Sequence, residues 1–456
     1  MSQSLALRFA NYASQLKYEQ LTKEAIHEVK RRLIDSFATA SGAMDSEAYQ
    51  IARKVASRMQ SSPGASLLNG GTSSIELATF VNGLLIRYLD FNDTYLSKEP
   101  AHPSDNLAPI LAVAEAYQAS GKEVITAAVL AYEIQCRLCD ACSLRKQGVD
   151  HVTYGAISSA IAASKLQKLD ASKIAHAIGL AGVSNVALRQ TRSGELSMWK
   201  GCAFANAARN GVFASLLAAD GLTGPAPIFE GDLGFMKLVT RDSFSVAPMG
   251  AEASSSEGFM INRTYIKYWP AEYHSQSAID AALQLRQELG NDVSAVQKID
   301  IYTFEASYNI IGKYLEAWKP KTRETADHSL PYCTAVALFD GEVTLKQFDP
   351  ERFTKSDIID FTAKVKVHLD DELSKGYPKG IPNRIVLTLA NGKTLSKEVA
   401  YPRGHAENPM TDAEVEAKFR GTVEPRFGKA KADKILSQCW ELDKLTEVGS
   451  LVESLA

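Results

Sequence analysis

The sequence lacks the features that would assign it to a membrane, nucleic-acid or disulfide-rich class. It has 456 residues, a formal net charge of −3 and six cysteines. Without an excess of Lys and Arg there is no basic face for nucleic acid, and six cysteines are too few for a disulfide framework. Apolar runs such as ISSAIAASKL are too short to cross a bilayer, and the charged N-terminal stretch has no signal-peptide core. These absences predict a soluble, cytoplasmic protein.

The sequence also lacks the common motifs of nucleotide binding and hydrolysis. It contains no Gly-rich loop followed by Lys-Ser/Thr, no strand–GxGxxG–helix, no HExxH and no G-x-S-x-G. Cys136, Cys139 and Cys142 have C-x2-C-x2-C spacing, which on its face resembles part of an iron–sulfur ligand run. Their flanks are good helix formers without Gly or Pro, and no fourth cysteine is near. We interpret the three as buried side chains on a helix.

Length and patterning predict two domains of different class. A chain of 456 residues exceeds the size at which a single hydrophobic core usually stops growing. Residues 1–263 show successive helical patterns, whereas residues 264–398 mix a helix with alternating strands and an Asn391-Gly392 hairpin signal. Helical patterning returns in 399–456. We predict a mainly α protein, with a large helical domain from 1–263 with 399–456 and a smaller α+β lid domain from 264–398.

One acidic loop interrupts the Ala- and Leu-rich pattern. The segment YLDFNDTYLSKEPAHPSDN, residues 88–106, carries several carboxylates and one histidine between two predicted helices. The helix before it is predicted to run to Asp90, and the helix after it to end at Gly121. The first helix would deliver Asp90 to a cleft, and the loop would bring His102 back to face it. We interpret this loop as functional, because solvation alone does not explain the apolar run before it.

Several of the eight histidines stand at junctions between predicted elements. Loop-placed histidines in both predicted domains suit proton transfer near neutral pH. The remaining histidines are weaker candidates or fit structural and exposed positions. The four junction histidines, each next to Pro, Gly, Asp or Tyr, are His102, His151, His274 and His328.

Cations stand at the predicted ends of helices, where backbone N–H groups also favour anions. Lys200 lies in SMWKGCAFANAARNG, and Arg189 and Arg192 lie in LRQTRSGE. A pocket that gathers these side chains with several histidines would suit a polycarboxylate. A plain surface lysine is an equally good reading of Lys200 from its position alone.

Five segments form an ordered set over nearly the whole chain: YLDFNDTYLSKEPAHPSDNLAPILAVAEA, MWKGCAFANAARNG, YWPAEYHSQSAIDAALQL, TRETADHSLPY and NPMT. In order and spacing they resemble the MmgE/PrpD family, which includes 2-methylcitrate dehydratase, cis-aconitate decarboxylase and iminodisuccinate epimerase. The resemblance implies a large helical domain made from both ends of the chain, a smaller α+β lid domain and a homodimer. It also implies a lyase of propionate metabolism that binds a small tricarboxylate without cofactor or metal, and without nucleic-acid or membrane partners.

The resemblance also implies which residues form the active site. The predicted catalytic residues are Asp90, His102, His151 and Lys200. Of the predicted substrate-binding residues, the resemblance implies Thr94, His274 and Gln276. The full predicted set also contains the two arginines at helix ends and two residues of TADHSLPY: Arg189, Arg192, His328 and Tyr332.

One departure from the family pattern bears on the substrate. Decarboxylase-like members have a histidine four residues before the Asp of the HSQSAIDAA helix, where this chain has Gln276. The histidine here is His274, two residues earlier, and PAEYHSQ is similar to the dehydratase branch. Both side chains would reach in from the lid domain, and closure of that domain would exclude water. A dehydratase of 2-methylcitrate or a related tricarboxylate is the leading interpretation. A cis-aconitate decarboxylase, an amino-dicarboxylate epimerase and a non-catalytic helical binding protein are the alternatives.

The expected mechanism gives each catalytic group a role. A dehydratase removes a weakly acidic proton α to a carboxylate and protonates a departing hydroxyl. His102, oriented by Asp90, is the leading acid/base, with His151 as its partner on the other face. Lys200 and Arg192 would stabilise the charge that develops on the carboxylate.

Overall fold

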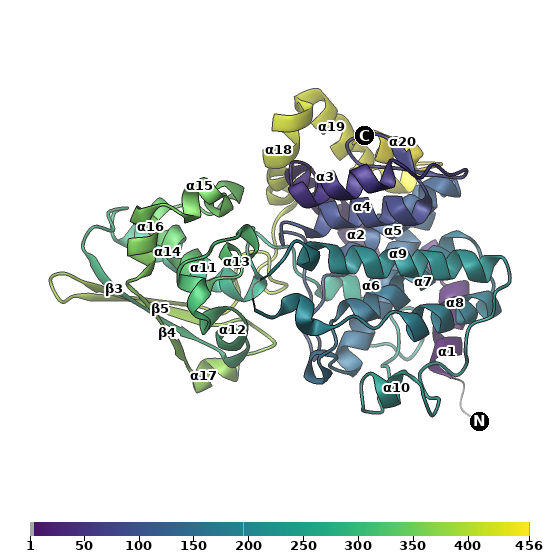
Figure 1. Cartoon of the computed structure of the whole chain (residues 1–456), viewed down its shortest axis with the longest axis horizontal. Coiled ribbons are helices and arrows are strands. Elements are labelled where there is room, and N and C mark those ends of the chain that lie inside the picture. The colour runs from purple at the N-terminus through teal and green to yellow at the C-terminus, as the bar shows by residue number, and fades with distance from the viewer. Residues whose placement is uncertain (1–3, 195, 456) are drawn as a thin grey trace. The chain divides into compact units, whose positions relative to one another are not determined.

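Two units make up the fold in the computed structural model, which describes residues 4–194 and 196–455 (Figure 1). The first unit comprises residues 4–194, 198–264 and 411–455, so both ends of the chain contribute to it. The second comprises residues 196–197 and 265–410. Helices dominate the described residues and the sheets are small, which confirms the predicted mainly α class.

The first unit is a packed set of helices with one two-stranded ribbon. Small residues bring its central helices close together: Gly211 of α9 faces Ala156 of α7, where a Cβ would lie 2.5 Å from the Ala156 carbonyl oxygen. Its main helices are α1 (Leu5–Gln15), α2 (Lys23–Ala43), α3 (Glu47–Ala56), α4 (Ile75–Arg87), α5 (Leu107–Ala116), α6 (Gly121–Ala141), α7 (Val152–Leu166), α8 (Ala171–Ser184), α9 (Trp199–Ala219), α10 (Phe235–Leu238), α18 (Asp412–Phe427), α19 (Lys429–Trp440) and α20 (Gly449–Glu453), and its ribbon pairs β1 (Ala65–Ser66) with β2 (Thr72–Ser73).

The last helices of the chain pack back on the first ones. In Figure 1, the yellow helices α18 and α19 lie beside the purple helices of the N-terminal part, and α18 contacts α2. A capping box at Thr411 starts α18, because Thr411 and Glu414 each satisfy a backbone N–H of the other. The return of the chain therefore begins at a defined helix cap.

The second unit is a four-stranded sheet with helices. The strand order is β4-β3-β5-β6; β3 and β4 run parallel, and the other neighbours are antiparallel. Its elements are β3 (Val296–Thr303), β4 (Val365–Leu369), β5 (Asn383–Leu389) and β6 (Thr394–Val399), with helices α11 (Gln276–Glu288), α12 (Glu305–Ser307), α13 (Arg323–Ala326), α14 (Leu330–Asp340), α15 (Pro350–Phe353), α16 (Ser356–Thr362) and α17 (Asp371–Ser374). Helix α11 covers β5 and β6, and apolar side chains of α11, α14 and the strands form one core.

Two helix limits differ from the sequence prediction. Helix α4 ends at Arg87, and Asp90 follows it in the left-handed region with φ +50°. Gly121 begins a helix instead of ending one, since Ser120 caps α6 in a capping box with Glu123. A Cβ at Gly121 would lie 1.6 Å from the Leu442 carbonyl oxygen, so close approach of another segment explains the glycine.

The three spaced cysteines are buried side chains, as predicted. Cys136 and Cys139 lie within α6, and Cys142 is its C-cap residue. Burial raises the pKa of all three thiols. They therefore behave as small apolar groups in the core of the first unit.

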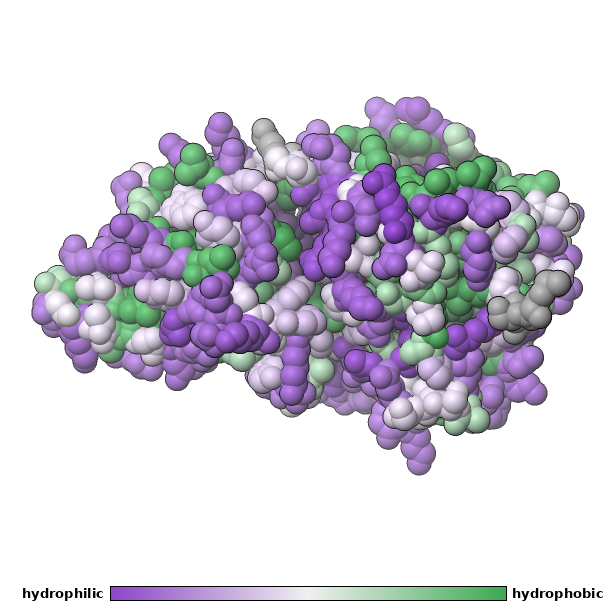
Figure 2. Space-filling model, turned by 90° about the horizontal axis from the view of Figure 1, so that it is seen from below, coloured by the Kyte–Doolittle hydropathy of each residue, from purple (hydrophilic) through white to green (hydrophobic). Residues whose placement is uncertain are grey.

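The surface is mixed in character. On the face shown in Figure 2, hydrophilic side chains are spread over both units; hydrophobic side chains gather along the upper right edge and show elsewhere in small areas. Among the described residues, no helix has both the length and the apolar character needed to span a membrane.

Candidate active site

Asp90 lies buried between two cations. Arg87, at the end of α4, donates from Nη1 to Asp90 Oδ1 over 2.6 Å, and Lys200, at the start of α9, donates to Asp90 Oδ2 over 2.9 Å. All three side chains are at most 2% exposed. The positive φ of Asp90 turns its carboxylate toward both donors, and the two ion pairs offset the cost of that conformation.

His102 is held by the same arginine and by the loop backbone. Its Nε2 lies 3.0 Å from Arg87 Nη2, and its Nδ1 lies 2.8 Å from the carbonyl oxygen of Asp93. Arg87 therefore bridges Asp90 and His102, and the predicted orientation of the imidazole by the carboxylate runs through a guanidinium.

His151 forms a separate carboxylate–histidine pair. It is the N-cap residue of α7, and its Nδ1 lies 3.0 Å from Oδ1 of Asp150. Arg192 Nε lies 2.9 Å from Asp150 Oδ2, so the predicted substrate-binding arginine is bound to a carboxylate in this structure. The Nε2 atom of His151 is buried and has no hydrogen-bond partner among the described residues. Its ring faces that of His102 edge-on, with centroids 5.7 Å apart.

The surroundings of His151 keep it neutral. Burial and the nearby Arg192 guanidinium lower the pKa of His151 to about 4, against the opposing effect of Asp150. Burial alone would raise the pKa of Asp150, but Arg192 and His151 outweigh it and hold that pKa well below its usual range. At neutral pH this pair is therefore an ionised carboxylate and a neutral imidazole with an open Nε2, the state required of a general base.

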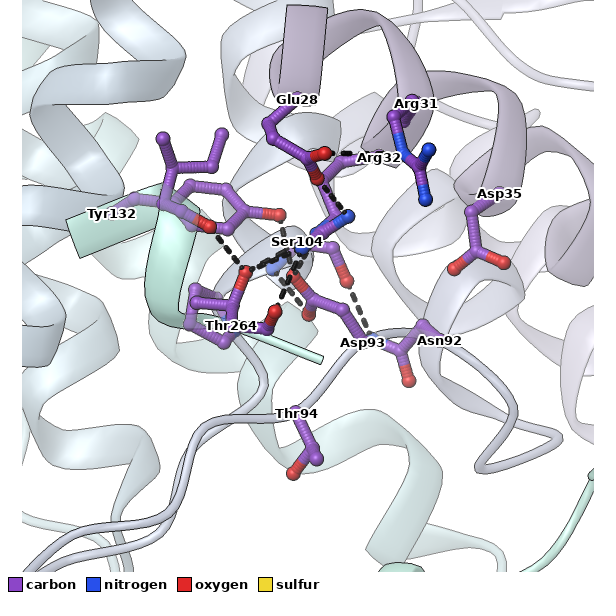
Figure 3. A network of polar contacts seen from close by, with 12 residues as sticks. Glu28, Arg31, Arg32, Asp35, Asn92, Asp93, Thr94, Ser104, Tyr132 and Thr264 are labelled. Carbon is purple, nitrogen blue, oxygen red and sulfur yellow. Dashed lines mark hydrogen bonds and ion pairs between the residues drawn. The ribbon is translucent and has the colours of Figure 1, made fainter. Parts of the chain in front are cut away.

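A network of polar groups around Asp93 holds the acidic loop, residues 88–106, in place (Figure 3). The Asp93 carboxylate accepts from the backbone N–H of Ser104 over 2.9 Å and from the Tyr132 hydroxyl over 2.7 Å, and it lies 3.4 Å from Arg32 Nε. Figure 3 shows these side chains converging on Asp93, whereas Thr94 lies apart from them. The Thr94 hydroxyl donates to the Ala101 carbonyl over 3.2 Å, across the base of the loop. Asp93 is thus a structural carboxylate.

Helix α18 also holds this loop. Lys418 donates to the carbonyl oxygen of Phe91 over 2.7 Å and lies 2.6 Å from Oδ1 of the buried Asp35 on α2. Its ammonium also lies 3.6 Å from the centroid of the Phe91 ring. The C-terminal segment therefore positions the backbone next to Asp90.

The second unit contains its own carboxylate–histidine pairs. His274 Nδ1 lies 2.6 Å from Glu272 Oε1, and its Nε2 is buried without a hydrogen-bond partner among the described residues. His328 Nδ1 lies 2.5 Å from Asp327 Oδ1, and the backbone N–H of Glu272 donates to the Asp327 carbonyl, so the two pairs are neighbours. Burial alone would raise the pKa of Glu272, but His274, His328 and the buried Lys267 lower it.

Two of the predicted substrate-binding residues, Gln276 and Tyr332, have polar groups occupied by backbone atoms, whereas a third, Arg189, does not show this. The Gln276 amide is occupied by backbone groups, since it accepts from the N–H of Trp269 and donates to the carbonyls of Trp269 and Ala271. Tyr332 lies in the core of the second unit, and its hydroxyl donates to the Gln347 carbonyl. Arg189 is partly buried beside Arg192, and burial lowers its pKa.

Comparisons with known proteins agree with this architecture. Residues 7–247 match the MmgE/PrpD N-terminal domain, and residues 269–442 match the MmgE/PrpD C-terminal domain. The chain belongs to the MmgE/PrpD family. The resemblance seen in the sequence is thereby confirmed.

Curated relatives in this family align over most of the chain. A "2-methylcitrate dehydratase" of Cupriavidus necator is 30% identical over 384 residues, which cover 79% of this chain and 77% of the relative. A "2-methylcitrate dehydratase, mitochondrial" of Yarrowia lipolytica is 31% identical over 379 residues, covering 78% and 71%. A fungal "alkylcitrate dehydratase phiI" is 31% identical over 411 residues, covering 82% and 79%.

Sequence reasoning did not assign four residues that the structure places in these clusters: Arg87, Asp150, Lys267 and Glu272. Asp150 directly precedes His151, and Glu272 stands two residues before His274, so a search for carboxylates next to junction histidines would have found both. Arg87 lies three residues before Asp90, a spacing that would put the two side chains on one face of the helix that the sequence predicted to run to Asp90. Lys267 carries no comparable local signal.

Proposed function

We propose that this protein is a hydro-lyase that dehydrates 2-methylcitrate or a related alkylated tricarboxylate to the corresponding cis-aconitate-type acid. Membership of the family and the dehydratase names of the relatives support the reaction class. The observation that carries the proposal is the facing pair of histidines, His102 and His151, next to the buried cations Arg87 and Lys200. Such an arrangement suits α-proton removal beside a carboxylate.

In this proposal His151 takes the α proton. It is neutral near pH 7, its Nε2 is open, and Asp150 holds the opposite nitrogen. A carboxylate behind an imidazole fixes the tautomer and stabilises the imidazolium that forms, as in hydrolytic triads. His102, on the other side, delivers the proton to the departing hydroxyl.

Positive charge supports the developing carbanion. Lys200 is buried and held by Asp90, so its position is fixed before substrate arrives. Charges set in place in advance cost no reorganisation during the reaction, and this is usually the largest catalytic term. We assign Arg189 and Thr94 to substrate binding, and Arg192 to support of the Asp150–His151 pair.

The second unit offers further groups for an anionic substrate. His274 and His328 each have a carboxylate behind one nitrogen, and Lys267 adds a cation to their cluster. The assignment of His274 and His328 to substrate binding stays a prediction from the sequence. Gln276 and Tyr332 are better explained as structural, because backbone atoms occupy their polar groups.

The homodimer and the cytoplasmic location are part of the proposal. The family resemblance supports a homodimer, and sedimentation of the purified protein at about twice its 49.6 kDa chain mass would establish it. One of the relatives carries the word mitochondrial in its name, so location varies within the family.

The deciding experiment separates the dehydratase from the decarboxylase. Purified protein is incubated with 2-methylcitrate, citrate or cis-aconitate, and unsaturated acid and carbon dioxide are measured. We expect unsaturated acid from 2-methylcitrate without carbon dioxide. His151→Asn should lower kcat by about 100- to 10,000-fold, whereas His27→Asn, at an exposed position, should leave it unchanged. Carbon dioxide from cis-aconitate, with no reaction of 2-methylcitrate, would overturn the proposal.

A further inference from the structure

The two ring nitrogens of His102 face partners of opposite hydrogen-bond chemistry. Nδ1 lies 2.8 Å from the carbonyl oxygen of Asp93, which can only accept, so Nδ1 carries the hydrogen. Nε2 lies 3.0 Å from Arg87 Nη2, and a guanidinium can only donate, so Nε2 presents its lone pair. These neighbours select one neutral tautomer. Protonation of Nε2 would set two N–H groups and two positive charges against each other.

Carboxylates hold Arg87 in this place. Nη1 donates to Asp90 over 2.6 Å, and Nε lies 3.8 Å from Asp105 Oδ2. The side chain is 2% exposed, and a guanidinium keeps its charge throughout the working range of pH. His102 therefore lies beside a permanent positive charge whose position is fixed by its own unit.

The proposed dehydration demands the opposite state of His102. A hydroxyl leaves readily as water only when a proton reaches it, and a bare Nε2 has none to give. A substrate carboxylate is a better acceptor for a guanidinium N–H than a neutral imidazole nitrogen, because both partners carry charge. Its arrival would draw Arg87 Nη2 away from Nε2 and place negative charge near the ring, which favours the imidazolium.

We propose, on the basis of the dehydratase function above, that Arg87 is a positioning residue that keeps His102 neutral in the unliganded enzyme and lets it gain a proton when a substrate carboxylate binds the guanidinium. Arg87 thus couples substrate binding to the protonation of His102, the proposed general acid. The coupling is a property of this chain's own residues and needs no further component.

Protons and electrons balance in this scheme. His151 takes the α proton, and the electron pair of that C–H bond becomes the second bond of the C=C group. The electron pair of the C–O bond leaves with oxygen, which takes the proton of His102 and departs as water. His102 is then neutral again, as in the unliganded enzyme, and His151 holds the proton taken from the substrate. Release of that proton to solvent as the product leaves cancels the uptake on binding and restores the unliganded enzyme.

Other titratable groups of the first unit surround His102 as well. Burial raises the pKa of Asp105 to about 7 against the effect of Arg87, so this carboxyl changes charge near neutral pH. Its ionised form would favour the imidazolium, and Asp105→Asn must therefore be compared with any change at Arg87. Among the described residues of the first unit, the charged and titratable groups are Arg87 of α4, Asp90 and Asp93 of the acidic loop, Asp105 of the 3-10 turn Pro103–Asn106, Asp150 and His151 at the start of α7, Arg192 and Lys200.

The first test reads the ring nitrogens directly. Protein labelled with 15N-histidine is titrated by NMR, and the His102 signals are assigned by their loss in His102→Asn. We expect unliganded wild-type His102 to show a protonated Nδ1 and an unprotonated Nε2 at pH 7. In Arg87→Gln its midpoint should rise by about one to two pH units, because an adjacent cation is gone. Arg137→Gln, which breaks another buried arginine pair, with Glu133, should not move it.

The second test adds propane-1,2,3-tricarboxylate, which has no hydroxyl to lose. In wild type it should give both His102 nitrogens a proton and cause net proton uptake in unbuffered solution. Arg87→Lys keeps the positive charge but removes the planar set of N–H donors that contacts Asp90 and His102 together. It should reduce the proton uptake at least severalfold. A protonated Nε2 in the unliganded wild type at pH 7, or a midpoint unchanged in Arg87→Gln, would overturn the inference. If Arg87→Gln does not fold, the wild-type spectra and Arg87→Lys still decide it.

The outcomes separate this inference from the proposed function. Failure of the tricarboxylate to shift any histidine signal would count against the proposed substrate class. The unliganded tautomer and its dependence on Arg87 would then stand or fall on the first test alone. Dehydration of 2-methylcitrate by a wild type whose His102 is protonated before binding would keep the function and reject the role of Arg87.

Discussion

At the scale of single residues, the candidate site consists of histidines whose state is set by the group behind them. His151 has an ionised carboxylate behind Nδ1, whereas His102 has a backbone carbonyl behind Nδ1 and a guanidinium at Nε2. The sequence predicted both histidines as candidates, because their placement at junctions next to Pro or Asp can be read from it directly. The partner of His151, Asp150, stands next to it in the sequence, whereas the contact of Arg87 with His102 depends on a side-chain direction that only the fold defines.

Asp150→Asn tests the group behind the proposed base. We expect kcat to fall by about 10- to 1,000-fold with little change in KM, because an amide stabilises the imidazolium less and can select the wrong tautomer. Asp150 raises the pKa of His151, so its loss should move the acidic limb of the kcat/KM profile to lower pH. A kcat within threefold of wild type would show that the pair is structural.

Asp105→Asn tests the buried carboxyl under Arg87. Burial raises its pKa from the ordinary value of 3.8 to about 7 in the folded chain, so the folded state binds more protons between these values. Stability from this group is therefore complete below pH 4 and is lost as pH rises through 7. The amide of Asp105→Asn does not titrate. Above pH 7 the free energy of unfolding of this variant should therefore exceed that of wild type by at most about 4 kcal/mol.

Urea unfolding at pH 5, 7 and 8.5 measures this difference. Asp371→Asn, on the exposed helix α17, is the matched control and should follow wild type at each pH. An advantage of Asp105→Asn that shrinks with rising pH would contradict the assignment.

At the scale of elements, patterning predicted helices and the hairpin well, but it misjudged the purpose of one glycine. The Asn391-Gly392 turn joins β5 and β6 as expected, because the φ of +81° at Gly392 is a local requirement. The pattern predicted a helix end at Gly121, yet this residue begins α6. The reason lies in Leu442, more than 300 residues away in sequence, whose carbonyl leaves no room for a side chain.

Two Gly→Ala substitutions separate the effect of a closely packed neighbouring segment from the effect of helix propensity. Gly121→Ala should destabilise the protein by about 3 kcal/mol or more, because its Cβ would meet the Leu442 carbonyl at 1.6 Å. Gly421→Ala, within α18, meets nothing within 4 Å and should stabilise by about 0.5 to 1 kcal/mol. The denaturant midpoints of the two variants measure the expected loss of stability in the first and the expected gain in the second. Equal effects would mean that helix propensity alone explains them.

At the scale of the whole molecule, the chain closes its first unit with its last helices. The sequence predicted that the C-terminal helices return to the first domain, but not that one of them reaches the acidic loop. That contact depends on Lys418, which by position alone is one of many helix lysines. Its ammonium is buried because Asp35 and the Phe91 carbonyl converge on it.

Lys418→Met tests this closure. Removal of one partner of a buried ion pair leaves the charge of Asp35 uncompensated, so we expect a loss of about 3 to 5 kcal/mol. Asp35→Asn added to it should recover part of that loss. Arg420→Met, which breaks a more exposed pair on the same helix, should cost less than about 1 kcal/mol. Similar losses for both single variants would show that the Lys418–Asp35 pair contributes no more to stability than a partly exposed ion pair.

The same contact sets an order of events during synthesis. Lys418 lies 327 residues beyond Phe91, and the whole second unit is translated between them. At about 5 to 20 residues per second, the ribosome needs roughly 15 to 65 seconds to make that interval. For an interval of equal length after the acidic loop leaves the tunnel, Asp35 still lacks its lysine. A nascent chain of this protein therefore completes the contacts of its acidic loop only when helix α18 emerges.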